Sequence, residues 1–480
     1  MSFRFVDNSN INSKTRKTIR SHVMKGKNCG KTRSKKEKQS KPTTERSIIT
    51  HRTGGALSSN EPPITTSEHP WDRNSMLAVT RQLANDPTLM SSTTRITPQA
   101  MLHFQQLYNF IMDIVSPPEF CRFTGVTEWM WFQLTFYNKA YFHSTIAIAS
   151  ACAAFLTEDP YHSPIALYHL SQAYRLINQE LSSNEELSDA TIAVVAAINV
   201  YDRLYGDPQK AMVHLNGVTR MVALRGGIGE LAKRNFIIAE KVFRSDIELA
   251  LNCGSKSKFS SDDVPRHLIL LHSWDCLEPR RLEEAELFGS VLHQSVCVDL
   301  REVVLDFLRL SRILDQANRG HDKLDVPAYQ STLMYVGYRL LETKCPHHDS
   351  EVNTNFDILV WLALVGFNNT FCFGLDRKLM TFPPVMEQFT SVAQTICEND
   401  RPRQMVVFWA LLMGKISSLT VGDETWLVTK LKALANDLEL RTWSEVSNAL
   451  RTFPWVKATH EVQGEKFWNR TLAQHIPDAS

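Results

Sequence analysis

The stretch SDATIAVVAAINVYDRLYGDPQKAMVHLNGVTRMVALRGG, residues 188–227, decides the fold class. Its first half begins at a capping residue, Ser188, and is apolar on most sides, which is typical of a helix packed inside other helices. Its second half begins at Asp207-Pro208, a cap followed by a residue suited to the first helical turn. Four apolar residues then recur at helical spacing: Ala211, Leu215, Val218 and Val222. Arg225-Gly226-Gly227 predicts the end of this helix.

A third helix is predicted just before this stretch, in SPIALYHLSQAYRLINQEL, residues 163–181. Ser163 can cap it and Pro164 suits its first position. The apolar residues at spacings of three and four predict one buried stripe: Leu167, Leu170, Tyr174, Ile177 and Leu181. Three helices joined by short turns indicate the core of a helical bundle.

The carboxyl half continues the helical pattern, and alternating patterns typical of strands are scarce. Further helices are predicted at 264–276, 283–315, 326–343, 355–375, 384–397, 402–417 and 422–438. We therefore expect an all-α fold, a large multi-helix domain at residues 71–480 that becomes ordered near Trp71.

The charge is divided unevenly along the chain. Residues 1–52 contain 15 Lys and Arg against Asp7, Glu37 and Glu45, a net charge of +12, so a chain of total charge +2 leaves −10 for the remainder. Residues 7–70 have few large apolar groups, which predicts disorder. We expect a basic tail at 1–52 and a Pro- and Gly-containing linker at 53–70.

The basic tail has several readings. It can be a nuclear import signal, an arm that contacts DNA phosphates, or a segment for solubility or mitochondrial targeting. The residues that supply its charge are Lys14, Arg16, Lys17, Arg20, Lys25, Lys27, Lys31, Arg33, Lys35, Lys36 and Lys38. Within it, GKNCGKT resembles a phosphate-binding loop, but one residue is missing and no apolar strand precedes it, so a nucleotide site is not expected.

Other protein classes fit the sequence poorly. The nine scattered cysteines form no C-x-x-C pair, which argues against a disulfide framework or a structural zinc site and favours a reducing compartment. The first thirty residues lack the apolar core of a secretory signal. The most apolar run, residues 146–156, is shorter than the roughly 20 residues that cross a bilayer. We expect an intracellular protein with no membrane span.

The search for chemistry yields no catalytic residue, no metal ligand set and no cofactor motif. His460-Glu461 begins a partial zinc-protease motif without its second histidine. Cys345-Pro346-His347-His348-Asp349 has metal-binding residue types but no second cluster at matching spacing. His272 and Cys276, one helical turn apart, are expected to pack in a core rather than bind zinc.

A resemblance to a known family accompanies the helices. The residues His214-Leu215-Asn216-Gly217 and Arg225-Gly226-Gly227 are similar to the HLxG…RGG signature of the fungal-specific transcription factor domain, the regulatory domain of fungal zinc-cluster regulators. The segments RSDIELAL at 244–251 and FPW at 453–455 also resemble parts of that domain. The likeness spans most of residues 70–475. It implies a structural role for His214, Gly217, Arg225, Gly226 and Gly227.

The resemblance implies a nuclear transcription regulator, not an enzyme, that acts on a metabolic or secondary-metabolite pathway. A binuclear zinc cluster needs six closely spaced cysteines, whereas only Cys29 precedes Cys121. DNA is therefore expected as a direct partner through the arm or as an indirect one through another transcription factor. The nuclear import machinery, a small apolar effector and a homodimer are further expected partners. The alternative is a cytoplasmic helical scaffold, or an enzyme without a recognisable motif.

Overall fold

A computed structural model describes most of the carboxyl four-fifths of the chain. The described residues are 97–122, 134–135, 137–156, 163–182, 187–205, 207–272, 290–320, 322–343, 354–372, 382–420 and 422–472. All of them lie in Asp72–Ser480, one of two compact units of the chain. The predicted basic tail, the linker, the GKNCGKT segment and residues 345–349 lie outside them.

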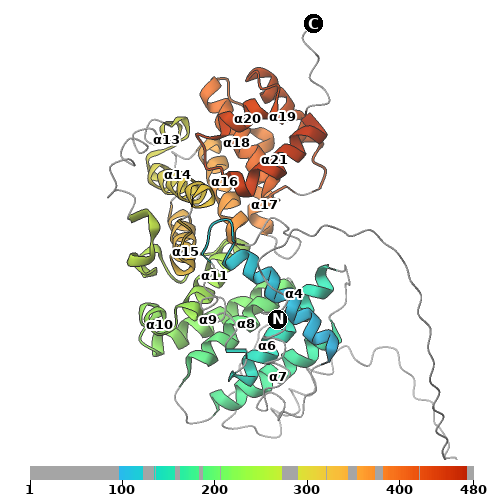
Figure 1. Cartoon of the computed structure of the whole chain (residues 1–480), viewed down its shortest axis with the longest axis vertical. Helices are drawn as coiled ribbons and strands as arrows, with labels where there is room; N and C mark the ends of the chain where they lie inside the picture. Colours follow the sequence, from blue (N-terminus) through green and yellow to red (C-terminus); the bar gives the residue numbers. More distant parts are fainter. Residues whose placement is uncertain are drawn as a thin grey trace, which may run out of the picture. The chain divides into compact units, whose positions relative to one another are not determined.

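The three helices predicted from residues 163–227 are confirmed, together with their caps (Figure 1). They are α7 (Pro164–Leu181), α8 (Asp189–Leu204) and α9 (Pro208–Leu224). The side chain of each capping residue accepts a hydrogen bond from a backbone N–H of the first turn: Ser163 from Ala166, Ser188 from Thr191 and Asp207 from Lys210. Local chemistry thus sets the starting point of all three helices.

The two glycines end α9 as predicted. Gly227 donates its N–H to Val222 O at 2.9 Å and Gly226 donates to Ala223 O at 3.2 Å, the paired bonds of a Schellman motif. Gly226 and Gly227 have φ of 95° and 93°, which only glycine adopts without strain. The motif satisfies two helix carbonyls and turns the chain directly into α10 (Ile228–Arg234).

The predicted apolar stripe of α9 is confirmed. The stripe of α7 is confirmed for Ile177, which is buried, and for Leu170 and Tyr174, which pack partly buried against the core, but not at its two ends. Ala211, Leu215, Val218 and Val222 are all buried in α9. In α7, Leu167 and Leu181 are 45% and 52% exposed. The face that α7 buries is offset from the prediction and consists of Ala166, His169, Ala173 and Ile177. Two alanines on this face let α7 pack against α6 (Lys139–Leu156), which the larger leucines would keep at a distance.

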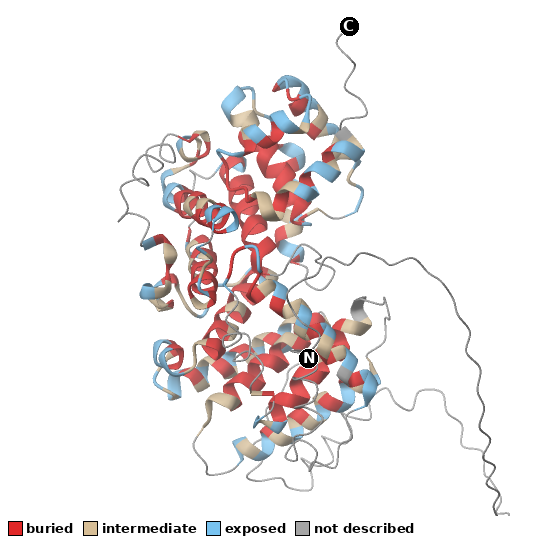
Figure 2. Ribbon diagram, in the orientation of Figure 1, coloured by how far each residue is buried: buried red, intermediate tan, exposed pale blue. Residues whose placement is uncertain are grey.

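Helix α8 is the centre of the amino-terminal group of helices, as predicted from the apolar residues on most of its sides. It packs against α6, α7, α9 and α11 (Phe236–Cys253), and nearly every residue from Thr191 onward is buried (Figure 2). Helix α4 (Pro98–Val115) packs against α6 and reaches α16. Helix α11 also contacts α15 and α17, so it joins this group to the carboxyl-terminal helices.

The carboxyl-terminal helices include five that match the predictions between residues 326 and 438, with small shifts at their ends, and two beyond residue 440 that were not predicted. They are α13 (Val291–Ser295), α14 (Val298–Arg319), α15 (Val326–Glu342), α16 (Asn355–Cys372), α17 (Pro383–Thr395), α18 (Arg401–Ile416), α19 (Thr425–Asp437), α20 (Trp443–Leu450) and α21 (Val462–Phe467). Short π-helical turns, Lys457–Glu461 and Trp468–Leu472, flank α21. Helix α16 is buried along almost its whole length and is a second central helix (Figure 2).

Two helix predictions in this half need correction. The described part of 264–276 is not an α-helix; it contains the short 3-10 turn Arg266–Leu268, and another such turn, Ser261–Asp263, comes just before it. Pro265 separates the two turns, since proline lacks the N–H that a continuous helix needs. The described part of 283–315 is two helices, because the chain is extended at Val296 and Cys297 between α13 and α14.

The fold class is all-α. Every regular element in the described ranges is helical, and the one strand-like contact there is an isolated bridge between Cys121 and Leu324. None of the helices in the described ranges combines the length and the apolar character that a bilayer span requires.

Candidate functional site

The motif residues of α9 join it to α8 as an antiparallel pair. His214 Nδ1 lies 2.7 Å from Asp202 Oδ2, which is two residues before the end of α8. At one end, Arg225 lies 3.2 Å from Asp189, and Arg234 of α10 lies 3.6 Å from the same carboxylate. Asp189 is in the first turn of α8, where the negative charge of a carboxylate also interacts favourably with the helix dipole. His214 and Arg225 thus each join α9 to α8 through a carboxylate of α8.

Gly217 is the motif residue without a structural reason in this chain. It lies inside α9, and a Cβ added to it meets no atom within 4 Å. The four other motif residues make the contacts or turn geometry described above, whereas the packing of the described residues leaves room for a side chain at Gly217.

The segment 244–251 lies on α11 and carries buried polar side chains that bind three other helices. Arg244 donates to Glu240 Oε1 at 2.7 Å, to Gln330 Oε1 of α15 at 2.6 Å and to the Cys372 carbonyl at the end of α16 at 2.5 Å. Gln330 in turn donates to the carbonyl of Val115, the last residue of α4, at 2.7 Å. Arg244 therefore links α11 with α4, α15 and α16.

Asp246, two residues further on α11, faces different partners. It accepts hydrogen bonds from the N–H groups of Lys258 and Phe259 and, at 3.0 Å, from the hydroxyl of Tyr338 on α15. Burial raises its pKa, although these hydrogen bonds act in the opposite direction. Asp246 thus fixes the chain after α11 and belongs to the scaffold.

A second buried ion pair joins α11 to α8. Glu248 pairs with Arg203, and both side chains are only 3% exposed. Arg203 also donates to Asn199 Oδ1 at 3.1 Å. Burial, together with the nearby charge of Arg244, lowers the pKa of Arg203 to about 9, so negative charge beside it is favourable. On α11, Lys241 donates a hydrogen bond to the hydroxyl of Tyr141 at 2.5 Å.

These charged groups form what we call the ion cluster: Arg203, Glu240, Lys241, Arg244 and Glu248. Four of the five line one cavity, the inner cavity, with a volume of about 170 Å³ between α4, α6, α8 and α11. Its other walls are mainly apolar, and include Phe110, Ile111, Ile148 and Val200. The surface that faces the cavity is therefore almost entirely apolar, although four charged residues are among those that line it.

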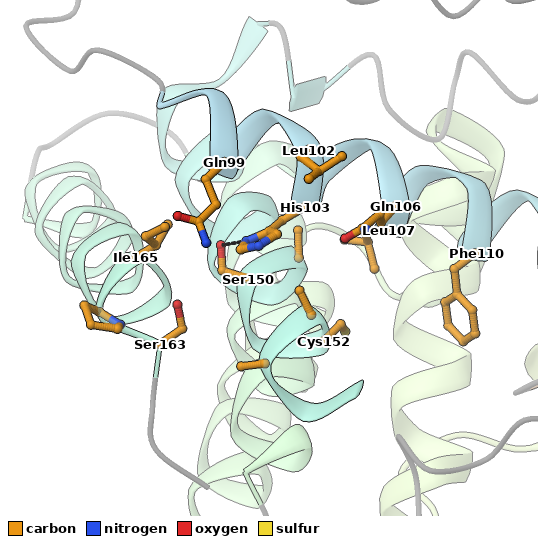
Figure 3. Close-up of a pocket in the computed structure, with 14 residues that line it drawn as sticks. Gln99, Leu102, His103, Gln106, Leu107, Phe110, Ser150, Cys152, Ser163 and Ile165 are labelled. Carbon is orange, nitrogen blue, oxygen red and sulfur yellow. Dashed lines mark hydrogen bonds between the residues drawn. The ribbon is translucent and has the colours of Figure 1, made fainter. Parts of the chain in front are cut away.

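A larger outer cavity adjoins the inner one. It has a volume of about 670 Å³ and lies between α4, α6 and the start of α7 (Figure 3). Leu107, Phe110 and Cys152 line both cavities. In Figure 3 Gln99, His103 and Gln106 project from α4 along the outer cavity, and His103 Nδ1 lies 3.2 Å from Ser150 Oγ of α6. The two cavities therefore share part of their walls.

Burial shifts the pKa of two titratable side chains that line the outer cavity, His103 and Cys152. Burial lowers the pKa of His103, so its imidazole is uncharged at neutral pH. Burial raises the pKa of the Cys152 thiol to about 12, so it is not a thiolate nucleophile. These groups suit binding rather than covalent chemistry.

Sequence reasoning missed the residues of this site. Arg203, Lys241 and Arg244 stand as charged residues within strongly apolar helical patterns, and that signal alone could have singled them out. The eleven basic residues of the tail lie outside the described residues, so the structure does not place them. Cys276 also lies outside. His272 is exposed and only contacts the ring of Tyr335 at its edge, so the prediction that it packs in a core is wrong.

The partial zinc-protease motif is structural. His460 is fully buried, accepts a hydrogen bond from the Val456 N–H at 3.0 Å and lies 3.0 Å from the hydroxyl of Thr370. Glu461 accepts hydrogen bonds from the indole N–H groups of Trp443 and Trp455. Within the described ranges, no three His, Cys, Asp or Glu side chains gather as ligands for a metal ion.

Comparison with known proteins bears on the helices around the ion cluster. Residues 128–269 match the family model of the fungal specific transcription factor domain. The matched range includes the α8 to α9 hairpin and all of α11, and so every member of the ion cluster. The predicted resemblance to this family is thereby confirmed, and the match indicates a transcription regulator. No curated protein and no solved structure matches the chain.

Proposed function

We propose that this protein is a nuclear transcription regulator of fungal type that acts by binding and not by catalysis. The observation that carries the proposal is the match of residues 128–269 to the fungal specific transcription factor domain. The residues of the matched region support it, because their buried polar groups are held in ion pairs and hydrogen bonds between helices rather than arranged as nucleophile and base.

The basic tail is the part of the chain suited to DNA phosphates and to nuclear import. Its charge of +12 contrasts with −10 for the remainder, so electrostatic attraction to DNA must come from the tail. The first 120 residues contain one cysteine, Cys29, which cannot form a binuclear zinc cluster. The protein therefore reaches its genes through the arm or through another transcription factor docked on the helical domain.

The experiment that tests this proposal is selection from a randomised DNA duplex pool near physiological salt, with the full chain beside a variant lacking residues 1–52. Enrichment of a defined site by the full chain alone assigns sequence recognition to the tail. Weak, salt-sensitive binding without enrichment assigns the tail to electrostatic anchoring and import, and leaves target choice to a partner.

Two measurements in cells complete the test. A fluorescent fusion of the full chain is expected in the nucleus, and one lacking residues 1–52 outside it. Deletion of the gene is expected to change the transcript levels of a defined gene set. A protein confined to the cytoplasm, or a deletion that leaves all transcripts unchanged, contradicts the proposal.

A further inference from the structure

The inner cavity is suited to one class of small molecule. Among the described residues it lies between α4, α6, α8 and α11. We propose that it binds a small, uncharged and largely hydrocarbon molecule of about the size of benzene or toluene. The inference deepens the proposed function: it rests on that function for its regulatory meaning, but the binding itself does not.

The first argument is the exposure of apolar side chains around the inner cavity. The cavity is lined by Phe110, Ile111 and Ile114 of α4, Ile148 of α6 and Val200 of α8, and each of these side chains is only partly buried. The packing of the helices therefore leaves apolar surface of three helices incompletely covered around the cavity. A hydrocarbon that fills the cavity removes such surface from water, which is favourable roughly in proportion to the apolar area buried.

The second argument is that the charged residues of the wall already have protein partners. Each of the four, Arg203, Lys241, Arg244 and Glu248, takes part in an ion pair or a hydrogen bond with another residue. The surface that faces the cavity is almost entirely apolar. A charged ligand would exchange its hydration for this apolar surface, which is costly. An uncharged molecule is therefore favoured.

The third argument is size. The inner cavity has a volume of about 170 Å³. In another protein, an engineered cavity of roughly 150 Å³ with apolar walls binds benzene. The inner cavity therefore has room for one aromatic ring. It has no room for a helix of a partner protein, whose diameter with side chains is about 10–12 Å.

The cavity lies beside the hydrogen bonds that link α4 and α16 to α11. Val115 and Cys372, the last residues of α4 and α16, both line it. Arg244 donates to the Cys372 carbonyl and to Gln330, and Gln330 donates to the Val115 carbonyl. A bound molecule stabilises the arrangement of α4, α8 and α11 that forms the cavity. The equilibrium between conformations then shifts toward that arrangement, by as much as the molecule prefers it.

The test is isothermal titration of the full-length protein with toluene, benzoate and benzylamine, which share a ring and differ in charge. Because the cavity surface is apolar, toluene is expected to bind at least about ten-fold more tightly than either ion. Triisopropylbenzene, which is apolar but much larger than toluene, is expected not to bind.

Three results of these titrations overturn the proposal. The first is equal affinity for toluene and the two ions. The second is binding of triisopropylbenzene as tight as that of toluene, because a site without a size limit is not this cavity. The third is no binding of toluene, which leaves the cavity to an apolar side chain of a partner protein.

Variants locate the site. Val200→Phe reduces the inner cavity and is expected to weaken the binding of toluene by about ten-fold or more. Val213→Phe is the matched control, because Val213 on α9 is 51% exposed and does not line the cavity. Ile111→Ala enlarges the cavity and is expected to shift the preference from toluene toward naphthalene. Circular dichroism shows whether each variant folds.

The remaining outcomes also decide the question. Toluene binding that both Val200→Phe and Ile111→Ala leave unchanged places the ligand elsewhere and overturns the site. If one variant does not fold, the other variant and the comparison of the four ligands on the unaltered protein still decide. Transcript profiling of the deletion is separate, so toluene binding at this cavity while transcription is unaffected retains the site and rejects the proposed function.

Discussion

Arg203 of α8 and Glu248 of α11 form an ion pair whose two side chains are each 3% exposed. Neither charge can recover hydration in the folded protein, so each depends on the other for its stability. The pair lies where the central helix of the amino-terminal group meets the helix that contacts α15 and α17. It therefore couples the packing of α8 to the rest of the domain.

Removal of one partner of this pair is expected to be strongly destabilising. Glu248→Gln leaves the Arg203 charge buried without its carboxylate, and we expect a loss of about 3–5 kcal/mol in the free energy of unfolding. Chemical denaturation followed by circular dichroism measures it. The double variant Arg203→Met/Glu248→Leu is expected to recover much of the loss, because neither buried charge remains.

The exposed pair Arg266 and Asp262 provides the control. Its side chains are 77% and 85% exposed, so Asp262→Ala is expected to cost at most about 1 kcal/mol. If Glu248→Gln costs no more than this control, Arg203 is hydrated or finds another partner, and the ion pair does not hold α8 against α11.

Replacement of two glycines inside helices by alanine is expected to change the free energy of unfolding in opposite directions. A Cβ at Gly414 of α18 lies 2.0 Å from Cζ of Phe389, a fully buried ring of α17, whereas a Cβ at Gly217 of α9 meets nothing within 4 Å. Gly414→Ala forces the ring aside, and we expect it to lower the free energy of unfolding by about 1–3 kcal/mol. Gly217→Ala is expected to raise it by about 0.5–1 kcal/mol, since alanine favours a helix.

Thermal and urea unfolding of the two variants check this pair of predictions. If the Gly414→Ala variant is as stable as the unaltered protein, α17 can move away from α18 without lowering the free energy of unfolding. A destabilised Gly217→Ala variant means that a segment outside the described residues packs against α9 at this position.

The contrast between α9 and α7 indicates how far the sequence predicts this fold. The caps Ser163, Ser188 and Asp207 and the glycines after α9 act through local hydrogen bonds and backbone geometry, so a single sequence discloses them. The buried face of α7 depends on how closely α6 approaches, and small residues such as Ala166 and Ala173 carry little weight in a search for large apolar groups. Packing between helices, not local pattern, selected that face.

The site was less predictable than the fold. The motif from His214 to Gly227 is visible in the sequence, and four of its residues make contacts or turns at the ends of α8 and α9. Arg203, Lys241 and Arg244 come from two helices, separated in the sequence by up to 41 residues, and they meet only because α8 packs against α11. A lone charged residue in an apolar helix signals a buried partner, but the sequence does not identify the partner.

The buried histidine pair between α6 and α7 is expected to make stability depend on pH. His143 Nδ1 and His169 Nδ1 lie 2.9 Å apart, and both residues are buried. Burial lowers the pKa of each to about 4, and for His143 the charges of His169 and Arg175 add to the effect. An unfolded histidine titrates near 6.5, so between about pH 6.5 and 4 the unfolded chain binds protons that the folded protein does not.

The free energy of unfolding is therefore expected to fall as pH is lowered from about 6.5 to 4, and to be insensitive to these two groups above pH 7. Urea unfolding at a series of pH values measures the slope. In the double variant His143→Phe/His169→Leu, this part of the slope is expected to disappear, with His293→Phe as a control at a less buried histidine. An unchanged slope in the double variant assigns the acid sensitivity to other groups.

The division of charge along the chain predicts the salt dependence of DNA binding. If roughly six of the basic residues of the tail contact phosphates, the logarithm of the affinity falls with a slope of about −5 against the logarithm of salt concentration. The remainder of the chain has a net charge of −10, so a variant lacking residues 1–52 is repelled by DNA and is expected to show no such slope. Fluorescence anisotropy with a labelled duplex at several salt concentrations measures both. A shallow slope for the full chain, or equal slopes for the two proteins, shows that the tail is not the main DNA contact and leaves it the role of an import signal.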